Sequence, residues 1–186
     1  MKKSLLLCTL TAAASTGAFA QNNVVKVNIL SPLYKTGSFF LEHKLTDDSS
    51  LQLGLLFSKA SIDDVRFSGF AITPEYRYYL SEQTTALEGF YVAPFLRYQY
   101  FNLGSKTSED EATLRAFGGG VVVGRHWIFK QRFSLDLFLG PSYNLGGTKL
   151  KTEEIDGADF EQTINDIPLL PPGFGIRSGL TFGLAF

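Results

Sequence analysis

Few residues in this 186-residue sequence have the types and spacing that catalysis or cofactor binding requires. Its two histidines, His43 and His126, form no His-x-x-x-His pair, and no Gly-x-Ser-x-Gly sequence is present to supply a nucleophilic serine. The glycine-rich stretch 118–124 invites comparison with a phosphate-binding loop, but no Gly-Lys-Ser or Gly-Lys-Thr follows it. The sequence therefore predicts no catalytic residue and no cofactor.

Metal binding is not favoured either. The only cysteine, Cys8, lies in an apolar run near the start of the chain, so neither a cysteine-based metal site nor a disulfide is expected. Six acidic residues gather near the end of the chain, but their spacing differs from that of an EF-hand loop: Glu153, Glu154, Asp156, Asp159, Glu161 and Asp166. We therefore predict no metal site.

A set of seven charged residues has a more regular placement. Each lies in a segment where apolar and polar residues alternate, and each falls on the face that also carries Gly, Ser and Thr. Such charges need to pair with one another inside a fold, because an unpaired buried charge is costly. We predict that they form a polar network: Lys26, Glu42, Glu75, Arg77, Arg97, Asp136 and Arg177.

The segments that must position these charges are predicted to be strands. Residues 176–186 are the clearest, because Phe182 and Leu184 alternate with Gly183 and Ala185. Eight such segments are found, at 24–30, 38–45, 50–58, 67–80, 89–102, 113–129, 132–143 and 176–186. Several of these segments have lengths close to the roughly 9 to 11 residues of a transmembrane strand. The sequence therefore predicts an all-β fold, an eight-stranded antiparallel up-and-down transmembrane β-barrel.

The connections between these segments are alternately short and long. The short ones are expected to be periplasmic turns, at 46–49, 81–88 and 130–131. The longer or more charged ones are expected to be outer loops, at 31–37, 59–66, 104–112 and 146–173. An even number of strands then places both termini in the periplasm.

The distribution of charge predicts which face of the strands points inward. Small side chains suit the crowded interior of an eight-stranded barrel, so the face with the seven charges is expected inside. The opposite face is an apolar band expected to contact lipid, whereas a soluble barrel such as a lipocalin would turn its charges outward. Aromatic residues towards the strand ends are expected to join this outer face as interfacial girdles: Tyr76, Tyr78, Tyr79, Tyr91, Tyr98, Tyr100 and Trp127.

The first 20 residues have the features of an export signal. Lys2 and Lys3 precede an apolar run, and small residues follow up to Ala20. We predict a signal peptide at 1–20 that is cleaved near Ala20, and a β-barrel domain at 21–186 in the outer membrane of a Gram-negative bacterium. The net charge of −1 and the lack of a basic cluster after Lys3 argue against a nucleic-acid partner. A monomer in outer-membrane lipid is expected.

Two of the segments resemble a known family. Residues 68–79 (SGFAITPEYRYY) and 89–98 (GFYVAPFLRY) resemble small outer-membrane barrel proteins of unknown function, similar in architecture to OmpX, OmpW and the OmpA barrel. The resemblance implies an eight-stranded barrel that is assembled by the outer-membrane insertion machinery, which recognises a C-terminal aromatic strand. Phe182, Leu184 and Phe186 match that assembly signal. No catalytic residue is implied.

The sequence alone is consistent with three functions. The leading one is a structural or surface-interaction role, in which the lumen is filled and loops 104–112 and 146–173 meet an extracellular partner. The second is a narrow pore or a transporter of small or hydrophobic molecules. The third is a lipid-modifying enzyme, for which His43 and His126 are poorly placed, because both fall near the periplasmic ends of their strands.

Overall fold

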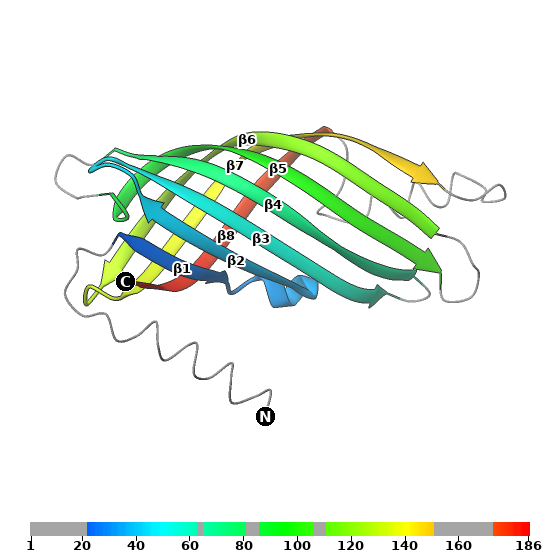
Figure 1. The fold of residues 1–186 in the computed structure, drawn as a ribbon, viewed down its shortest axis with the longest axis horizontal. Coiled ribbons are helices and arrows are strands. Elements are labelled where there is room, and N and C mark those ends of the chain that lie inside the picture. The colour runs from blue at the N-terminus through cyan, green and yellow to red at the C-terminus, as the bar shows by residue number, and fades with distance from the viewer. Residues whose placement is uncertain (1–21, 63–64, 81–85, 106–110, 151–172) are drawn as a thin grey trace, which may run out of the picture.

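The alternating segments form eight antiparallel strands, each paired with its neighbours in sequence, and β8 pairs with β1 to close a barrel (Figure 1). The computed structural model describes residues 22–62, 65–80, 86–105, 111–150 and 173–186. The strands are β1 (Asn23–Asn28), β2 (Thr36–Lys44), β3 (Ser49–Ile62), β4 (Val65–Tyr79), β5 (Gly89–Ser105), β6 (Glu111–Phe129), β7 (Phe133–Leu150) and β8 (Gly173–Ala185). The predicted eight-stranded antiparallel barrel is confirmed.

The middle strands are longer than the sequence predicted. β3 and β4 pair continuously from Ser49 opposite Tyr78 to Ile62 opposite Val65, so most of the expected loop 59–66 is strand. Likewise, β5 runs on to Ser105, β6 starts at Glu111 and β7 continues to Leu150. The prediction failed here because hydrophobic alternation marks only the part of a strand that contacts an apolar environment, whereas backbone pairing continues without it. The expected signal peptide 1–20 and the acidic residues between 153 and 166 lie outside the described residues.

By contrast, β1 has only six residues. It pairs with β8 from Val24 opposite Ala185 to Asn28 opposite Thr181, whereas β8 pairs with β7 as far as Gly173. Among the described residues, 173–179 of β8 therefore have a strand neighbour on one side only. β1 and β2 end well short of the tips of β4, β5 and β6 (Figure 1). The wall of the barrel is thus uneven at its outer end.

A short 3-10 helix, η1 (Ser31–Tyr34), connects β1 to β2. Pro32 lies in its first turn, where the missing N–H of proline costs nothing. Lys35 ends it in the left-handed conformation and donates its backbone N–H to the Pro32 carbonyl at 3.0 Å. No helix within the described ranges is long and apolar enough to cross a membrane.

At the opposite end of the barrel, the connections are tight. Lys130 and Gln131 both have positive φ, as the two central residues of a type I′ turn do, and the Arg132 N–H bonds the Phe129 carbonyl at 3.1 Å. Leu87 lies just before β5, and it is only 2% exposed. It packs in a cluster with Val24 and Ala185, so its side chain fills this end of the barrel.

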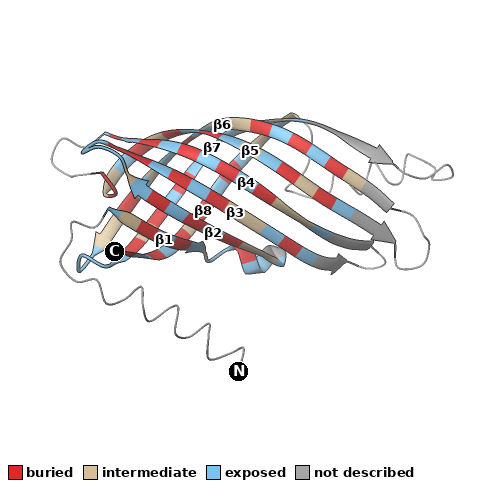
Figure 2. Cartoon of the chain, viewed as in Figure 1, coloured by how far each residue is buried: buried red, intermediate tan, exposed pale blue. Residues whose placement is uncertain are grey.

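Buried and exposed residues alternate along the strands, which Figure 2 shows as bands. On β8, Arg177 and Thr181 are 8% and 1% exposed and point inward. Phe182, Leu184 and Phe186 are 44%, 40% and 43% exposed and point outward. A barrel of eight strands leaves an interior that side chains can fill, so the inward residues form the core.

Candidate functional site: a buried cluster of ion pairs

Six charged side chains meet inside the barrel, and we call them the lumen cluster: Lys26, Glu42, Glu75, Arg77, Asp136 and Arg177. They come from β1, β2, β4, β7 and β8, and each occupies an inward position of its strand. None is more than 8% exposed. Because a charge buried without a partner costs several kcal/mol, the contacts among these residues determine whether the barrel can hold them.

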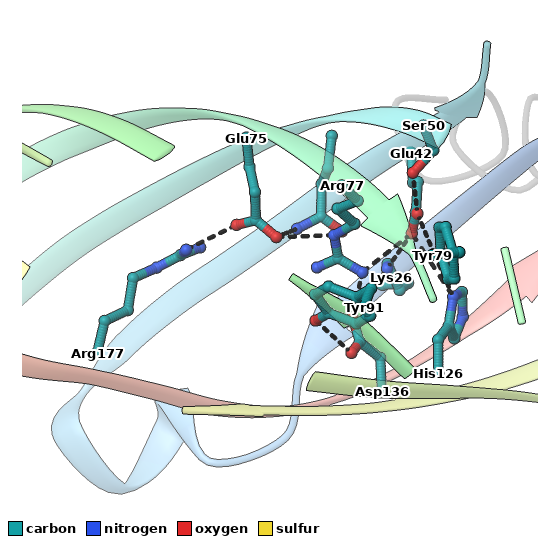
Figure 3. Close-up of polar contacts among 11 residues, drawn as sticks. Lys26, Glu42, Ser50, Glu75, Arg77, Tyr79, Tyr91, His126, Asp136 and Arg177 are labelled. Carbon is teal, nitrogen blue, oxygen red and sulfur yellow. Dashed lines mark hydrogen bonds and ion pairs between the residues drawn. The ribbon is translucent and has the colours of Figure 1, made fainter. Parts of the chain in front are cut away.

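The centre of the lumen cluster consists of two cations and two carboxylates. Arg77 Nη1 donates to Asp136 Oδ2 at 2.7 Å and to Glu42 Oε2 at 3.2 Å. Lys26 Nζ donates to Asp136 Oδ2 at 3.0 Å and also pairs with Glu42. Each carboxylate thus lies between the same two cations (Figure 3). Lys26 and Glu42 lie on the neighbouring strands β1 and β2, whereas the contact of Arg77 with Asp136 crosses the lumen from β4 to β7.

From this centre the contacts continue along the barrel. Arg77 Nε donates to Glu75 Oε1 at 2.7 Å, and Arg177 Nη1 donates to Glu75 Oε2 at 2.6 Å. Figure 3 shows this row running from Arg177 through Glu75 and Arg77 to Glu42 and Asp136. Charge-assisted hydrogen bonds of this length are the strong class, and every carboxylate in the row has at least two cationic partners.

Hydroxyl groups complete the bonding of the carboxylates. Ser50 Oγ and the Tyr79 hydroxyl both donate to Glu42 Oε1, at 2.5 and 2.6 Å. The Tyr91 hydroxyl donates to Asp136 Oδ1 at 2.8 Å. Both oxygens of each central carboxylate therefore accept hydrogen bonds, which offsets the cost of removing them from water.

The positions of Tyr79 and Tyr91 correct a sequence prediction. Both were expected in the outer aromatic girdle, but they are 2% and 1% exposed and face the lumen. Tyr79 lies two residues after Arg77 on β4, so it shares the inward face with that charge, and the Arg77 guanidinium carbon lies 4.3 Å from the centre of the Tyr91 ring. Strand parity was the signal that could have found them.

His126 was not included in the predicted network, yet the structure places it beside the lumen cluster. It is fully buried, with Nδ1 3.3 Å from the Tyr79 hydroxyl and 3.7 Å from Glu42 Oε2. His43 is instead exposed, with Nδ1 2.8 Å from Asn23 Oδ1. Within the described part of the chain, no group of three or more His, Cys, Asp or Glu side chains is arranged to hold a metal ion.

Arg97 is the one predicted network residue that the structure does not bring into the lumen cluster. It lies on β5, and among the described residues no hydrogen-bond acceptor is found for its Nε atom and no carboxylate pairs with it. It lines a cavity of about 260 Å³ together with Arg177. Of the seven predicted residues, four are cations and three are carboxylates, so Arg97 is the excess positive charge.

The outer face of the strands is apolar. Leucine side chains around the barrel are about half exposed: Leu41, Leu51, Leu96, Leu137 and Leu139 have exposed fractions of 50%, 48%, 53%, 51% and 55%. Of the predicted girdle, Tyr76, Tyr78 and Tyr98 are exposed on this face, at 44%, 47% and 40%. The arrangement is the reverse of a water-soluble protein, with charges inside and apolar side chains outside.

Comparison with known proteins gives a family and one similar structure. A family model described as "Protein of unknown function (DUF3575)" matches residues 4–162. No curated protein matches the chain. Among solved structures, the crystal structure of the N-terminal β-barrel domain of Pseudomonas aeruginosa OprF is similar, with 18% identity and a TM-score of 0.47 over 89% of this chain and 98% of that chain. Since the family model spans well over half of the sequence, this protein belongs to the DUF3575 family.

Proposed function

We propose that this protein is an integral barrel of a bacterial outer membrane, with a lumen closed by side chains and a structural or surface-interaction role carried by its outer loops. One observation carries the proposal: the exposed face of the strands is apolar, while charged side chains are buried in the lumen. The signal peptide expected at 1–20 and the C-terminal aromatic strand ending in Phe186 are consistent with export and insertion.

The apolar outer face supports a lipid environment. Soluble monomers rarely expose a contiguous apolar patch larger than a few hundred Å². Here exposed leucine, phenylalanine, valine and isoleucine side chains occur on every strand from β1 to β8. Burying them in lipid is favourable by roughly 25 cal/mol per Å² of apolar surface, and a closed barrel leaves few backbone groups unpaired there.

The lumen cluster supports a closed interior. Its members cross the barrel from β1 and β2 to β4 and β7, and these ion pairs must separate to let a solute pass. Leu87 and Ala86 are also buried at the inner end, at 2% and 4% exposure. We therefore propose that the folded barrel conducts no ions steadily.

The remaining role falls to the outer ends of the strands and the loops that join them. We propose that residues 104–112 and 146–173, which combine strand ends with the connections 106–110 and 151–172, contact an extracellular partner, because connections on a rigid scaffold commonly carry function. The barrel is proposed to act as a monomer held by outer-membrane lipid. No enzymatic activity is included, and comparing outer-membrane lipids with and without the protein, together with a His126→Ala variant, tests this.

Membrane location is tested by cell fractionation and by electrophoresis of unheated samples. The protein should be found with the outer membrane, resist extraction by carbonate, and migrate differently before and after boiling, as detergent-resistant barrels do. Recovery from the soluble periplasm in folded form would overturn the proposal. A second candidate, binding or passage of hydrophobic molecules, is favoured by the cavity that Arg97 and Arg177 line.

A further inference from the structure

We infer that the outer half of the barrel binds a long-chain fatty acid, with its carboxylate between Arg97 and Arg177 and its chain leaving through a gap in the wall beside β8. The inference rests on the proposed membrane location, since the ligand would enter from lipid. Three observations carry it: a cavity beside the open edge of β8, an uncompensated arginine that lines this cavity, and apolar side chains in its lining both inside the barrel and beside β8.

The cavity lies beside residues 176–178 of β8. Its lining includes the inward Arg177 and also the outward Ile176 and Ser178. The lining also includes Leu30 and Ser31, which follow the end of β1, so the cavity lies where β8 loses its pairing with β1. Within the part of the chain that the structure describes, this edge of β8 is open because β1 ends at Asn28, opposite Thr181, and residues 173–179 of β8 pair with β7 alone.

The gap is expected at the membrane interface. An open strand edge is not tolerated in the hydrocarbon region, because its backbone N–H and C=O groups would lack partners. The connection 29–35, which includes η1, lies beside this edge, and the Ile29 N–H bonds the Leu180 carbonyl at 3.0 Å. The head groups of single-chain lipids lie at the same depth, so a carboxylate could enter the barrel sideways without crossing the apolar core.

The charge inside the cavity favours an anion. Arg177 Nη1 donates a hydrogen bond to Glu75. No described carboxylate pairs with Arg97, and the charge that acts most strongly on Arg97 is the positive charge of Arg177. Two guanidinium groups that share a cavity without enough carboxylates repel each other. A carboxylate placed between them would relieve this repulsion and could accept paired N–H bonds from arginine.

Part of the lining is apolar and could contact an acyl chain, beside the polar side chains of Ser38 and Thr73. Phe40 and Phe138 line the cavity from inside the barrel, with ring centres 6.5 Å apart, and Leu30 and Ile176 lie at the opening. Ile176 is 79% exposed, so an apolar surface continues outward from the gap.

The size of the cavity favours one chain over two. Its volume of about 260 Å³ is below the roughly 300–1,000 Å³ of pockets that enclose drug-sized ligands. The cavity therefore holds a head group and the first part of one chain, with the remainder in lipid. A two-chain phospholipid head would not fit beside the two arginines.

Binding is tested with the full mature protein, folded and heat-modifiable, in nanodiscs of zwitterionic phosphatidylcholine. Radiolabelled palmitate should bind saturably to one site per protein. Hexadecanol, which has the chain without the charge, should compete at least about tenfold more weakly, because a hydrogen bond to a charged group is worth about 1.5–3 kcal/mol. Inorganic phosphate, which has charge without a chain, should not compete at millimolar concentration. Equal competition by hexadecanol and palmitate would overturn the assignment of the head group.

Two variants locate the site. Arg97→Gln should weaken palmitate binding by at least about tenfold, whereas Arg115→Gln, which removes an exposed guanidinium from the adjacent strand β6, should leave binding unchanged. Thr73→Phe should fill the cavity and reduce binding, whereas Ile72→Phe, its outward neighbour, should not. Wild-type affinity in folded Arg97→Gln would overturn the inference.

The test separates this inference from the proposed function. A photoactivatable palmitate should label peptides that contain residues 29–40 or 173–180, which flank the gap, rather than the whole lipid-facing surface. Uniform labelling, or no saturable binding by a protein that is correctly inserted in the outer membrane, would overturn the inference and leave the membrane proposal intact. A protein found folded in the periplasm would overturn the membrane proposal first.

Discussion

Arg77 Nη1 lies 2.7 Å from Asp136 Oδ2, and this contact joins β4 to β7 across the lumen between residues 59 positions apart in the sequence. Both side chains are fully buried. The contact is therefore a direct link between opposite walls of the barrel, and the rest of the lumen cluster is arranged around it. Because Arg77 and Asp136 also pair with other members of the lumen cluster, removing either side chain alone is expected to destabilise the barrel.

Removing one charge from this pair should destabilise the barrel strongly. Arg77→Gln or Asp136→Asn alone is expected to lower the free energy of unfolding by about 3–5 kcal/mol, because each removes one of the partners of several buried charges and leaves the cluster unbalanced. The double variant should cost less than the sum of the two, as expected for residues in contact. Urea titration in lipid vesicles measures all three. Arg125→Gln, which alters an exposed arginine on β6, is the control and should cost less than about 1 kcal/mol.

The hydroxyl of Tyr91 should matter more than the hydroxyl of an outward tyrosine. Tyr91→Phe removes the hydrogen bond to Asp136 and is expected to cost about 1.5–3 kcal/mol, since the acceptor is charged and buried. Tyr98→Phe alters a side chain that is 40% exposed on the outer face and should have little effect. Equal effects of the two substitutions on the urea midpoint would contradict the inward placement of Tyr91.

Leu87 should stabilise the inner end of the barrel without being the barrier to ions. Leu87→Ala is expected to lower the free energy of unfolding by about 2–5 kcal/mol, as for other buried leucines. Leu80→Ala, at a side chain 57% exposed, is the matched control and should cost much less. The conductance of Leu87→Ala in planar bilayers should stay at the wild-type level because the lumen cluster remains. A steady open state in this variant would show that Leu87 is the barrier.

Gly124 should tolerate no side chain, because β6 approaches Tyr91 closely there. A Cβ atom at this position would lie 2.5 Å from the Tyr91 hydroxyl oxygen and 2.8 Å from the Leu137 carbonyl oxygen. Gly124→Ala is therefore expected to cost about 1–3 kcal/mol through overpacking. Gly175→Ala, whose Cβ would meet only the Ser142 Oγ at 3.1 Å and the Asn144 Nδ2 at 3.9 Å, should be near neutral. Comparable losses of heat-modifiable protein in both variants would contradict this packing.

The sequence predicted the barrel well because its signal is local. Strand alternation needs only the identity of neighbouring residues, and it predicted the number and order of strands found in the structure. The extension of β3 and β4 through residues 59–62 and 65–66 was missed, because those residues lack the alternation that lipid contact imposes. The buried Leu87 was missed because a turn segment that folds into the barrel mouth has no periodic pattern.

The contacts of the lumen cluster could not be predicted from the sequence in the same way. Parity places Arg77 and Asp136 on inward faces, but whether they meet depends on strand tilt and register, which alternation does not determine. His126 was set aside because a lone histidine has no local signal of its environment. Arg97 shares the parity of a network residue, yet its position on β5 brings it to the cavity beside Arg177 rather than to a carboxylate.

Single-channel recording tests the central claim most directly, because the account requires a membrane-inserted barrel whose lumen is closed by ion pairs. Heat-modifiable protein in a planar lipid bilayer is predicted to show no steady open level at moderate voltage. Frequent openings are predicted only when the lumen cluster is reduced, as in a Glu75→Ala, Arg77→Ala double variant that remains folded. A steady conductance in the wild-type protein that changes with Glu75→Gln or Arg97→Gln would contradict the closed lumen.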